Sequence, residues 1–267
     1  MAKAAVLGAA GRMGKAILRV LAESPYGLSL GGAVEAAGHP ALGRDAFEEA
    51  GAGRAGIPIT ADLAAALASS DVAIDFTHAS SAPLHALQAA RAGTPLVLGS
   101  TGLSPEQVAS VREASARIAC VLSPNMSVGV NLMFRVAADV AKVLGNEYDV
   151  EIVEVHHRFK KDSPSGTAVR LAESVAEALG RDLAEAGVYG RRGMTGERSR
   201  EEIGVFAVRA GDVVGEHTLV FGGIGERLEI THRAHSRDTF ARGAVRAAAW
   251  LLDREPGLYD MRAVLGI

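Results

Sequence analysis

A glycine-rich turn between an apolar strand and a helix lies at the start of the chain, and it constrains the fold more than any other feature. Residues 4–7 are apolar and predict a strand, and the glycines Gly8, Gly11 and Gly14 follow at once. A helical apolar pattern begins directly after them, which is the context that a dinucleotide-binding turn requires. The first glycine permits the tight turn, the next lets a pyrophosphate approach the backbone, and the third lets the helix pack on the strand. The segment therefore predicts a parallel α/β domain, although its G-x-x-G-x-x-G spacing is less specific than G-x-G-x-x-G.

A carboxylate stands at the end of the second predicted strand, residues 28–34. Glu35 follows this strand and lies 21 residues after Gly14. In a Rossmann-type unit this position holds the acid that accepts hydrogen bonds from the adenosine ribose. A carboxylate at a strand end is often simply solvated, but the glycine turn upstream favours the ribose role for Glu35.

Strands and helices then alternate along the first half of the chain. The predicted strands are residues 72–76, 95–99 and 118–122, and the predicted helices are residues 81–92 and 104–117. This succession predicts a doubly wound parallel sheet, which binds ligands beyond the carboxyl ends of its strands. Three of those ends carry loops of ligand-type residues, at 75–78, 99–102 and 123–126. Such residues also serve turns, so it is their common position at one edge of the sheet that favours a binding role.

Residues 151–167 form a second segment that carries chemistry. β-branched residues alternate with acids at its start, which predicts a strand. Five potentially cationic side chains follow between His156 and Lys161. A proline suited to a helix start precedes Gly166 and Thr167, which fall in the first helical turn, where unpaired amides bind carboxylate or phosphate. The segment predicts a pocket for a small acidic molecule that exchanges protons.

Charge and composition limit the alternatives. A charge run alone is most often a solvated basic loop, but the 267 residues together carry a formal net charge of −3, so this positive charge is local. The same net charge gives no pull toward nucleic acid or an anionic membrane. No apolar run reaches the roughly 18 residues of a membrane span, and no apolar leader precedes the first strand, so we expect a cytoplasmic protein. The single cysteine, Cys120, lies in an apolar run and is expected to be buried and inert, with no metal site.

The pattern of elements changes after residue 127. Helix 127–145 leads into the strand described above, helix 165–179 follows it, and the charged stretch 181–202 predicts a mobile or subunit-contacting loop. Three further strands are predicted at 205–209, 216–221 and 226–234, and a closing helix at 237–253. With no helices between them, these three strands should pair antiparallel. We therefore predict an α/β protein of two domains: residues 1–127 with 237–267 bind the dinucleotide, and residues 128–236, with a mixed or antiparallel sheet, bind the substrate and mediate oligomerisation.

Seven motifs along nearly the whole chain resemble those of one known family. They are Gly8–Gly14 (GAAGRMG), Asp75–Thr77 (DFT), Gly99–Gly102 (GSTG), Ser123–Gly129 (SPNMSVG), Glu154–Ala168 (EVHHRFKKDSPSGTA), Gly211–Thr218 (GDVVGEHT) and Gly257–Met261 (GLYDM). With these motifs the chain resembles the dihydrodipicolinate reductases, also called 4-hydroxy-tetrahydrodipicolinate reductases, of the diaminopimelate–lysine pathway. The stretch from the histidine pair to Ser-Gly-Thr is highly specific, whereas a glycine turn alone is not.

The resemblance implies an activity and roles for individual residues. It implies NAD(P)H-dependent reduction of a small cyclic dicarboxylate, 4-hydroxy-tetrahydrodipicolinate, to tetrahydrodipicolinate by a homotetramer. His156 would be the proton donor or acceptor and Lys160 a second proton donor. The substrate would contact His157, Gly166 and Thr167. The cofactor would contact Gly8, Ala9, Ala10, Gly11, Arg12, Met13, Glu35, Gly99, Ser100, Thr101, Ser123, Pro124, Asn125 and Met126.

One departure from the family bears on the choice of cofactor. Ala36 follows Glu35, where members that favour NADPH carry an arginine for the 2′-phosphate. A carboxylate at this site favours NADH, and Arg12 or His39 could supply the missing positive charge. We therefore expect the chain to use both NADH and NADPH without a strong preference.

Two alternatives of different kinds stay open at this point. A two-domain dehydrogenase acting on an amino-acid semialdehyde would share the N-terminal half but would not need the loop of His156 and Lys160. A cofactor-binding sensor without catalysis would be expected to have lost these two side chains, and both are present.

Overall fold

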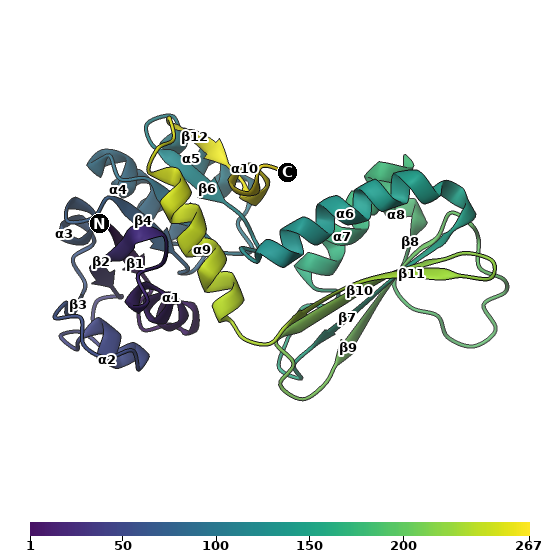
Figure 1. Ribbon diagram of the computed structural model, residues 1–267, viewed down its shortest axis with the longest axis horizontal. Coiled ribbons are helices and arrows are strands. Elements are labelled where there is room, and N and C mark those ends of the chain that lie inside the picture. The colour runs from purple at the N-terminus through teal and green to yellow at the C-terminus, as the bar shows by residue number, and fades with distance from the viewer. The chain divides into compact units, whose positions relative to one another are not determined.

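The chain folds into two compact units, each with its own hydrophobic core (Figure 1). The computed structural model describes residues 1–267, apart from the side chain of Pro25. The first unit contains Met1–Val128 and Arg237–Ile267, and the second contains Gly129–Ser236. The chain thus leaves the first unit once, builds the whole second unit, and returns to finish the first.

The first unit is built on a seven-stranded parallel sheet in the order β12-β6-β5-β4-β1-β2-β3. Its strands are β1 (Ala2–Leu7), β2 (Leu28–Val34), β3 (Ile59–Thr60), β4 (Val72–Asp75), β5 (Leu96–Leu98), β6 (Ala119–Leu122) and β12 (Gly257–Tyr259). The strand order reverses at β1, which lies between β2 and β4, so the predicted doubly wound sheet is confirmed. The short strands β3 and β12 were not predicted, because two or three residues are too few for an alternating pattern.

Helices cover both faces of this sheet. α1 (Arg12–Ala22), α2 (Ala46–Ala50), α9 (Asp238–Leu251) and α10 (Met261–Leu265) pack on one face, and α3 (Leu63–Ala68), α4 (Ala82–Ala92) and α5 (Pro105–Ser115) pack on the other. Successive residues of β1 serve opposite layers, since Val6 joins the first core and Leu7 the second. A one-turn 3-10 helix, Pro25–Gly27, leads into β2. Cys120 is buried in this unit, as predicted, and burial raises its pKa to about 12.

The second unit is a five-stranded mixed sheet in the order β11-β10-β7-β9-β8. Its strands are β7 (Asp149–His156), β8 (Gly187–Val188), β9 (Ile203–Arg209), β10 (Gly215–Gly222) and β11 (Arg227–Ala234). β10 pairs antiparallel with both β7 and β11, but β9 pairs parallel with β7. The prediction that the three late strands pair antiparallel with one another is therefore wrong for β9. β7 lies between β9 and β10. After β7 the chain passes through α7 to β8, the edge strand that pairs with β9.

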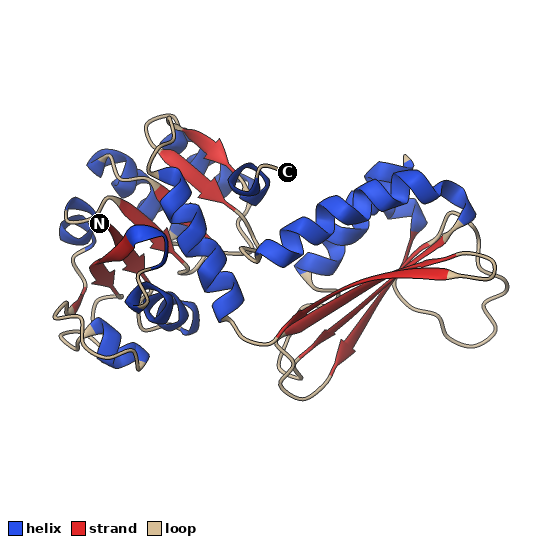
Figure 2. Cartoon of the chain, viewed as in Figure 1, coloured by secondary structure: helices blue, strands red, loops and turns tan.

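All helices of the second unit lie on one side of its sheet (Figure 2). They are α6 (Val128–Leu144), α7 (Gly166–Leu179) and α8 (Leu183–Ala186), with a 3-10 turn at Gly145–Glu147 after α6. Alternating residues of β7, including Val150 and Ile152, point into this helical layer and are buried. The opposite face of the sheet carries no helix.

Helix length and side-chain clustering also bear on membranes and metals. Across the part of the chain that the structure describes, no helix is both long and apolar enough to cross a membrane. The same residues contain no group of three or more His, Cys, Asp or Glu side chains that could hold a metal ion.

Candidate active site

The glycine turn after β1 brings backbone amides to the start of α1. Gly8 has a φ of 76°, a left-handed conformation that favours glycine. A Cβ on Gly14 would lie 2.0 Å from the carbonyl oxygen of Gly8, so only glycine lets α1 begin this close to the strand. Gly11 precedes α1, and no described side chain caps the helix there. The first amides of α1 therefore form a site suited to a phosphate group.

Glu35 lies directly against this turn. Its Oε1 accepts a hydrogen bond of 2.8 Å from the Ala10 N–H, and its Oε2 accepts one of 3.2 Å from the Ala36 N–H. The predicted ribose acid and the predicted phosphate turn are thus neighbours at the carboxyl ends of β1 and β2. Arg12 is exposed beside them.

The loop after β4 is held by a buried carboxylate. Asp75 is fully buried, and its Oδ1 accepts hydrogen bonds from the backbone N–H and the hydroxyl of Thr77 at 2.7 and 2.6 Å. Its Oδ2 lies 2.8 Å from Nδ1 of His85, on α4. A Cβ on Gly8 would lie 3.1 Å from the Thr77 methyl carbon, so this loop adjoins the glycine turn. His85 was not predicted, because its helix position carries no motif.

The loops after β5 and β6 complete the same edge of the sheet. The Ser100 hydroxyl donates to the Thr77 carbonyl at 2.9 Å, and Gly99 packs against the ring of Phe76, where a Cβ would lie 2.2 Å from a ring carbon. The Ser123 hydroxyl donates to the Asn125 carbonyl at 2.9 Å. The contacts of Ser100 and Gly99 hold the loop after β5 beside the loop after β4, and the Ser123 hydrogen bond fixes the backbone within the loop after β6.

Two of the residues that were predicted to contact the cofactor have buried side chains. Ala9 and Met126 have side chains buried in the core, so they could contact a cofactor only through the backbone. Gly243 of α9 packs under Met126, and a Cβ there would lie 1.7 Å from the Met126 carbonyl oxygen. The residues at this edge fit a dinucleotide: an uncapped helix start, a carboxylate beside it and loops with exposed backbone at the strand order reversal.

A cluster of polar side chains interrupts the helical face of the second sheet at the end of β7. Glu154 is fully buried and continues the inward-pointing row of this strand. Its Oε2 lies 2.5 Å from Nδ1 of His156. Arg209 of β9 donates two hydrogen bonds to the same carboxylate, at 2.8 and 2.9 Å. Since an ionised carboxylate only accepts hydrogen bonds, Nδ1 of His156 carries the proton and Nε2 is left for chemistry.

The charges in this cluster shift one another's pKa values. Burial tends to raise the pKa of Glu154, but the hydrogen bonds from Arg209, His156 and the Ser165 N–H outweigh burial and hold it below its usual range. Burial lowers the pKa of His156, and Glu154, which raises it, offsets only part of this effect. The Glu154 carboxylate is therefore ionised and the His156 ring is predominantly neutral near pH 7.

The start of α7 is joined to the same cluster. Ser165 caps the helix, because its hydroxyl accepts a hydrogen bond of 3.2 Å from the Ala168 N–H. Its own N–H donates to Glu154 at 3.0 Å, and its hydroxyl lies 3.1 Å from Nε2 of His217. A Cβ on Gly166 would meet no atom within 4 Å, so the first turn of α7 is open on that side. Gly166 and Thr167 fall in this first turn, where we predicted them.

The loop between β7 and α7 carries the remaining predicted residues. Nζ of Lys160 lies 2.9 Å from the carboxylate of Asp162, and its side chain is 21% exposed. Nδ1 of His157 is buried and has no hydrogen-bond partner among the described residues. The hydrogen-bonding capacity of this nitrogen is therefore unsatisfied in this structure.

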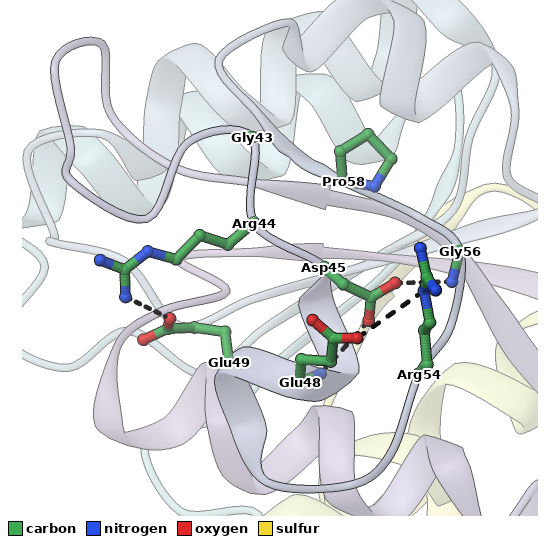
Figure 3. A pocket seen from close by; sticks show the side chains of 8 residues that line it. All are labelled: Gly43, Arg44, Asp45, Glu48, Glu49, Arg54, Gly56 and Pro58. Carbon is green, nitrogen blue, oxygen red and sulfur yellow. Dashed lines mark hydrogen bonds and ion pairs between the residues drawn. The ribbon is translucent and has the colours of Figure 1, made fainter.

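The hollow drawn in Figure 3 contains none of the predicted residues. It is lined by Gly43, Arg44, Asp45, Glu48, Glu49, Arg54, Gly56 and Pro58. Its charged groups are paired internally, Arg44 with Glu49 at 3.0 Å and Arg54 with Glu48 at 3.7 Å. This hollow thus presents charges that already satisfy one another.

The structure therefore brings the predicted residues together in two groups, one in each unit. The first group lines the carboxyl ends of β1, β2, β5 and β6, and the second lines the end of β7 and the start of α7. Sequence reasoning missed Glu154, Arg209 and His217 as members of the second group. Glu154 left a signal, since it is an acid at a position where the alternation of β7 requires a buried residue. His217 lies in the motif Gly211–Thr218, which assigned it no role.

Comparisons with known proteins match the whole chain. Family models described as dihydrodipicolinate reductase, N-terminus and C-terminus, match residues 2–126 and 129–265. A 4-hydroxy-tetrahydrodipicolinate reductase of Syntrophus aciditrophicus is 55% identical over 266 residues, covering 100% of this chain and 99% of that protein. A protein of the same name from Anaeromyxobacter dehalogenans is 56% identical, covering 100% and 98%.

Solved structures show the same fold at low sequence identity. A dipicolinate-bound dihydrodipicolinate reductase from Paenisporosarcina sp. TG-14 superposes with a TM-score of 0.76 at 23% identity, covering 97% of each chain. An amine dehydrogenase from Mycobacterium smegmatis superposes with a TM-score of 0.59 at 16% identity, covering 96% of this chain and 94% of that one.

Proposed function

The chain belongs to the dihydrodipicolinate reductase family, and we propose that it reduces 4-hydroxy-tetrahydrodipicolinate to tetrahydrodipicolinate in lysine biosynthesis. The observation that carries this function is the match of both family models, together with curated relatives 51–56% identical over the full chain. The predicted family and enzyme class are confirmed. The chain is an oxidoreductase that depends on a pyridine nucleotide, and its first unit has the Rossmann-type fold expected of one.

The first unit is proposed to hold the dinucleotide at the edge formed by β1, β2, β5 and β6. The open amides at the start of α1 would bind the pyrophosphate, and Glu35 would exchange its hydrogen bond with Ala10 for one with the adenosine ribose. When bound, the reduced nicotinamide supplies a hydride to the substrate ring. Ser100, Asn125 and their neighbours shape the loops that would line the nicotinamide end.

The charges near the adenosine ribose site bear on the choice between NADH and NADPH. Glu35 is an anion and Ala36 adds no cation, which supports NADH. Arg12 is exposed close to the turn and supplies one positive charge for a 2′-phosphate. We expect KM values for NADH and NADPH within a factor of about ten of each other; a KM for NADPH a hundredfold lower would contradict this expectation.

The second unit is proposed to bind the dicarboxylate and to supply its proton. The substrate carboxylates would be held by the open first turn of α7, at Gly166 and Thr167, and by the unpartnered nitrogen of His157. The dipicolinate that accompanies the related Paenisporosarcina structure is itself such a dicarboxylate.

Reduction consumes one hydride and one proton, and the 4-hydroxyl group leaves as water. The chain offers two proton carriers, His156 through Nε2 and Lys160 through its ammonium group. His156 is predominantly neutral in the free protein, because burial lowers its pKa. A bound dianion would favour the protonated ring, so we expect the pKa that governs kcat to exceed that of free His156.

The experiment that tests this function follows oxidation of the nicotinamide cofactor. The substrate would be made in place by condensing pyruvate with aspartate semialdehyde, using the synthase that precedes the reductase. Oxidation of NADH that depends on the synthase is the expected result, and repeating the assay with NADPH ranks the cofactors. Binding of NADH without synthase-dependent oxidation would reject the reductase and favour a cofactor-binding sensor.

We further infer that the chain assembles as a homo-oligomer through the open face of the second sheet, which we call the outer face. The outer face carries Val153, Val155, Phe206, Val208 and Val220, which alternate with the buried row. Val208 is 43% exposed. Arg191 covers Phe206, with its guanidinium 5.2 Å from the ring centre, but the valines have no helix above them. A row of β-branched residues on a sheet face without a helical layer is suited to pairing with a second copy of the same face.

A further inference from the structure

The two proton carriers of the second unit are linked through one arginine. Arg209 lies on β9, 49 residues after Lys160. It donates two hydrogen bonds to the carboxylate of Glu154, which in turn binds His156. The same guanidinium donates a hydrogen bond of 2.7 Å to the carbonyl oxygen of Asp162, whose carboxylate pairs with Lys160. Each proton carrier is thus two contacts away from Arg209.

The carboxylate of Glu154 is fully occupied by these partners. It accepts from both guanidinium nitrogens, from Nδ1 of His156 and from the Ser165 N–H. These partners come from β9, from its own strand and from the start of α7. Four hydrogen bonds fix the orientation of this buried carboxylate. Through its hydrogen bond to Nδ1, the carboxylate also fixes the orientation of the His156 ring.

We propose that Glu154 and Arg209 are positioning residues that together fix the tautomer of His156 and the placement of the loop carrying Lys160. This inference rests on the proposed function, in which His156 and Lys160 supply the proton. Neither Glu154 nor Arg209 needs to touch the substrate in this role. Glu154 keeps the proton of the neutral ring on Nδ1, so that Nε2 takes up and releases the catalytic proton.

The surroundings of Nε2 agree with this assignment. A Cβ on Gly215 of β10 would lie 3.0 Å from Nε2, so glycine leaves this nitrogen free of a neighbouring side chain. The charged and titratable groups that face His156 come from four elements. They are Glu154 on β7, Lys160 in the following loop, Arg209 on β9 and His217 on β10, whose ring centre lies 5.3 Å from that of His156. Glu154 is the one anion in this set, and therefore the group that favours a protonated ring.

The test replaces the carboxylate with its neutral isostere, Glu154→Gln. Nitrogen-15 NMR of the ring, assigned with His156→Gln, reports the tautomer and the titration of His156 in the protein without substrate. We expect Nδ1 to carry the proton of the neutral ring in the wild type, and the titration midpoint to fall to lower pH in Glu154→Gln. In the coupled assay kcat should fall on the order of 10- to 100-fold, with KM for NADH unchanged.

Glu151→Gln is the matched control. Glu151 lies on the same strand and pairs with two arginines, Arg191 and Arg198, but it faces away from His156. This control should change the stability of the second unit and leave the His156 titration and kcat as in the wild type. If Glu154→Gln behaves in the same way, Glu154 serves only stability and the proposal is wrong.

A second variant keeps the inference testable if Glu154→Gln does not fold. Arg209→Lys retains the charge, but a single ammonium cannot make three hydrogen bonds in the guanidinium geometry. We expect kcat to fall about tenfold with the tautomer of His156 preserved; wild-type kcat would overturn the role of Arg209. Because the NMR measurement needs no substrate, an inactive wild type with the expected His156 signals would reject the reductase and not the positioning pair.

Discussion

His156 and His217 lie with ring centres 5.3 Å apart, but His156 is hydrogen-bonded to a carboxylate and His217 to a hydroxyl. Glu154 binds Nδ1 of His156 and supports protonation of that ring. His217 is buried against the Ser165 hydroxyl, and burial lowers its pKa to about 3. The two histidines of this cluster therefore differ: Glu154 offsets part of the effect of burial on His156, whereas His217 stays neutral and hydrogen-bonds the Ser165 hydroxyl that caps α7.

Substitution of the two proposed proton carriers gives the first prediction. His156→Gln should lower kcat on the order of 100-fold, the usual contribution of one general acid. Lys160→Ala should lower kcat further, because it removes a proton and a positive charge together. Steady-state kinetics with the coupled assay measures both, and unchanged turnover in both variants would refute the assignment.

The buried His217 gives a second prediction, about stability in acid. Between pH 6.5 and about 3 the unfolded chain binds a proton at this residue that the folded chain does not. The free energy of unfolding therefore falls as the pH falls, by roughly a few kcal/mol. In His217→Gln this term is absent, so Tm should decline less between pH 7 and pH 4 than in the wild type. Parallel Tm profiles for the two proteins would show that His217 does not cause the decline.

At the scale of single residues, the sequence predicted site residues that are close along the chain and missed contacts that depend on strand register. His156, Lys160 and Gly166 lie in one continuous segment, so spacing was enough to group them. Arg209 lies 55 residues beyond Glu154 and meets it only because β9 pairs parallel with β7. Nothing in the local sequence predicts that pairing.

Among the elements, α7 connects the packing of the second unit with the proposed substrate site most directly. Its N-cap, Ser165, holds the first helical turn, the Glu154 carboxylate and the ring of His217 in one arrangement. Helix α5 has a comparable cap at Ser104, which forms a capping box with Gln107. The two caps differ in that only the cap of α7 borders the predicted substrate residues.

This difference gives a third prediction. Ser165→Ala and Ser104→Ala should each cost about 1 kcal/mol of stability, the usual value of an N-cap. Only Ser165→Ala should also raise KM for the substrate, because it loosens the turn that presents Gly166 and Thr167. Thermal unfolding and steady-state kinetics on both variants measure the two effects, and equal KM values would contradict the role of α7.

The boundaries of long elements agreed with expectation, while short elements and one pairing did not. Helix 165–179 was predicted from its periodicity and is observed as Gly166–Leu179. The stretch 181–202 was predicted as a mobile or subunit-contacting loop. It contains α8 and β8, and Arg198 forms ion pairs with Asp149 and Glu151. Local propensity cannot reveal ion pairs between residues so far apart in the sequence.

At the scale of the whole molecule, the outer face of the second sheet predicts assembly. Val208→Asp would place a charge among the valines of the outer face, which should weaken pairing with a second copy. Val143→Asp on α6 is the control, since Val143 is 85% exposed on the helical side. We expect light scattering after size exclusion to show a homotetramer for the wild type and Val143→Asp, and smaller species for Val208→Asp. A monomeric wild type would contradict the inferred assembly.

The presence of two units could be predicted from the sequence because the pattern of elements changes along the chain. Alternating strands and helices predict the parallel sheet of the first unit, and the change of pattern after residue 127 predicts the second unit, observed as Gly129–Ser236. The strand order β11-β10-β7-β9-β8 was not accessible, because the pairing of β7 with both β9 and β10 depends on contacts that form only in the folded chain.

The most direct test of the reductase itself is transfer of a labelled hydride. The coupled reaction would be run with NADH that carries deuterium at its transferable position, and tetrahydrodipicolinate would be analysed by mass spectrometry. We predict a product that carries one deuterium from the cofactor, while the proton consumed in the reaction leaves with the 4-hydroxyl group as water. Oxidation of the labelled NADH that leaves the product without deuterium would contradict it.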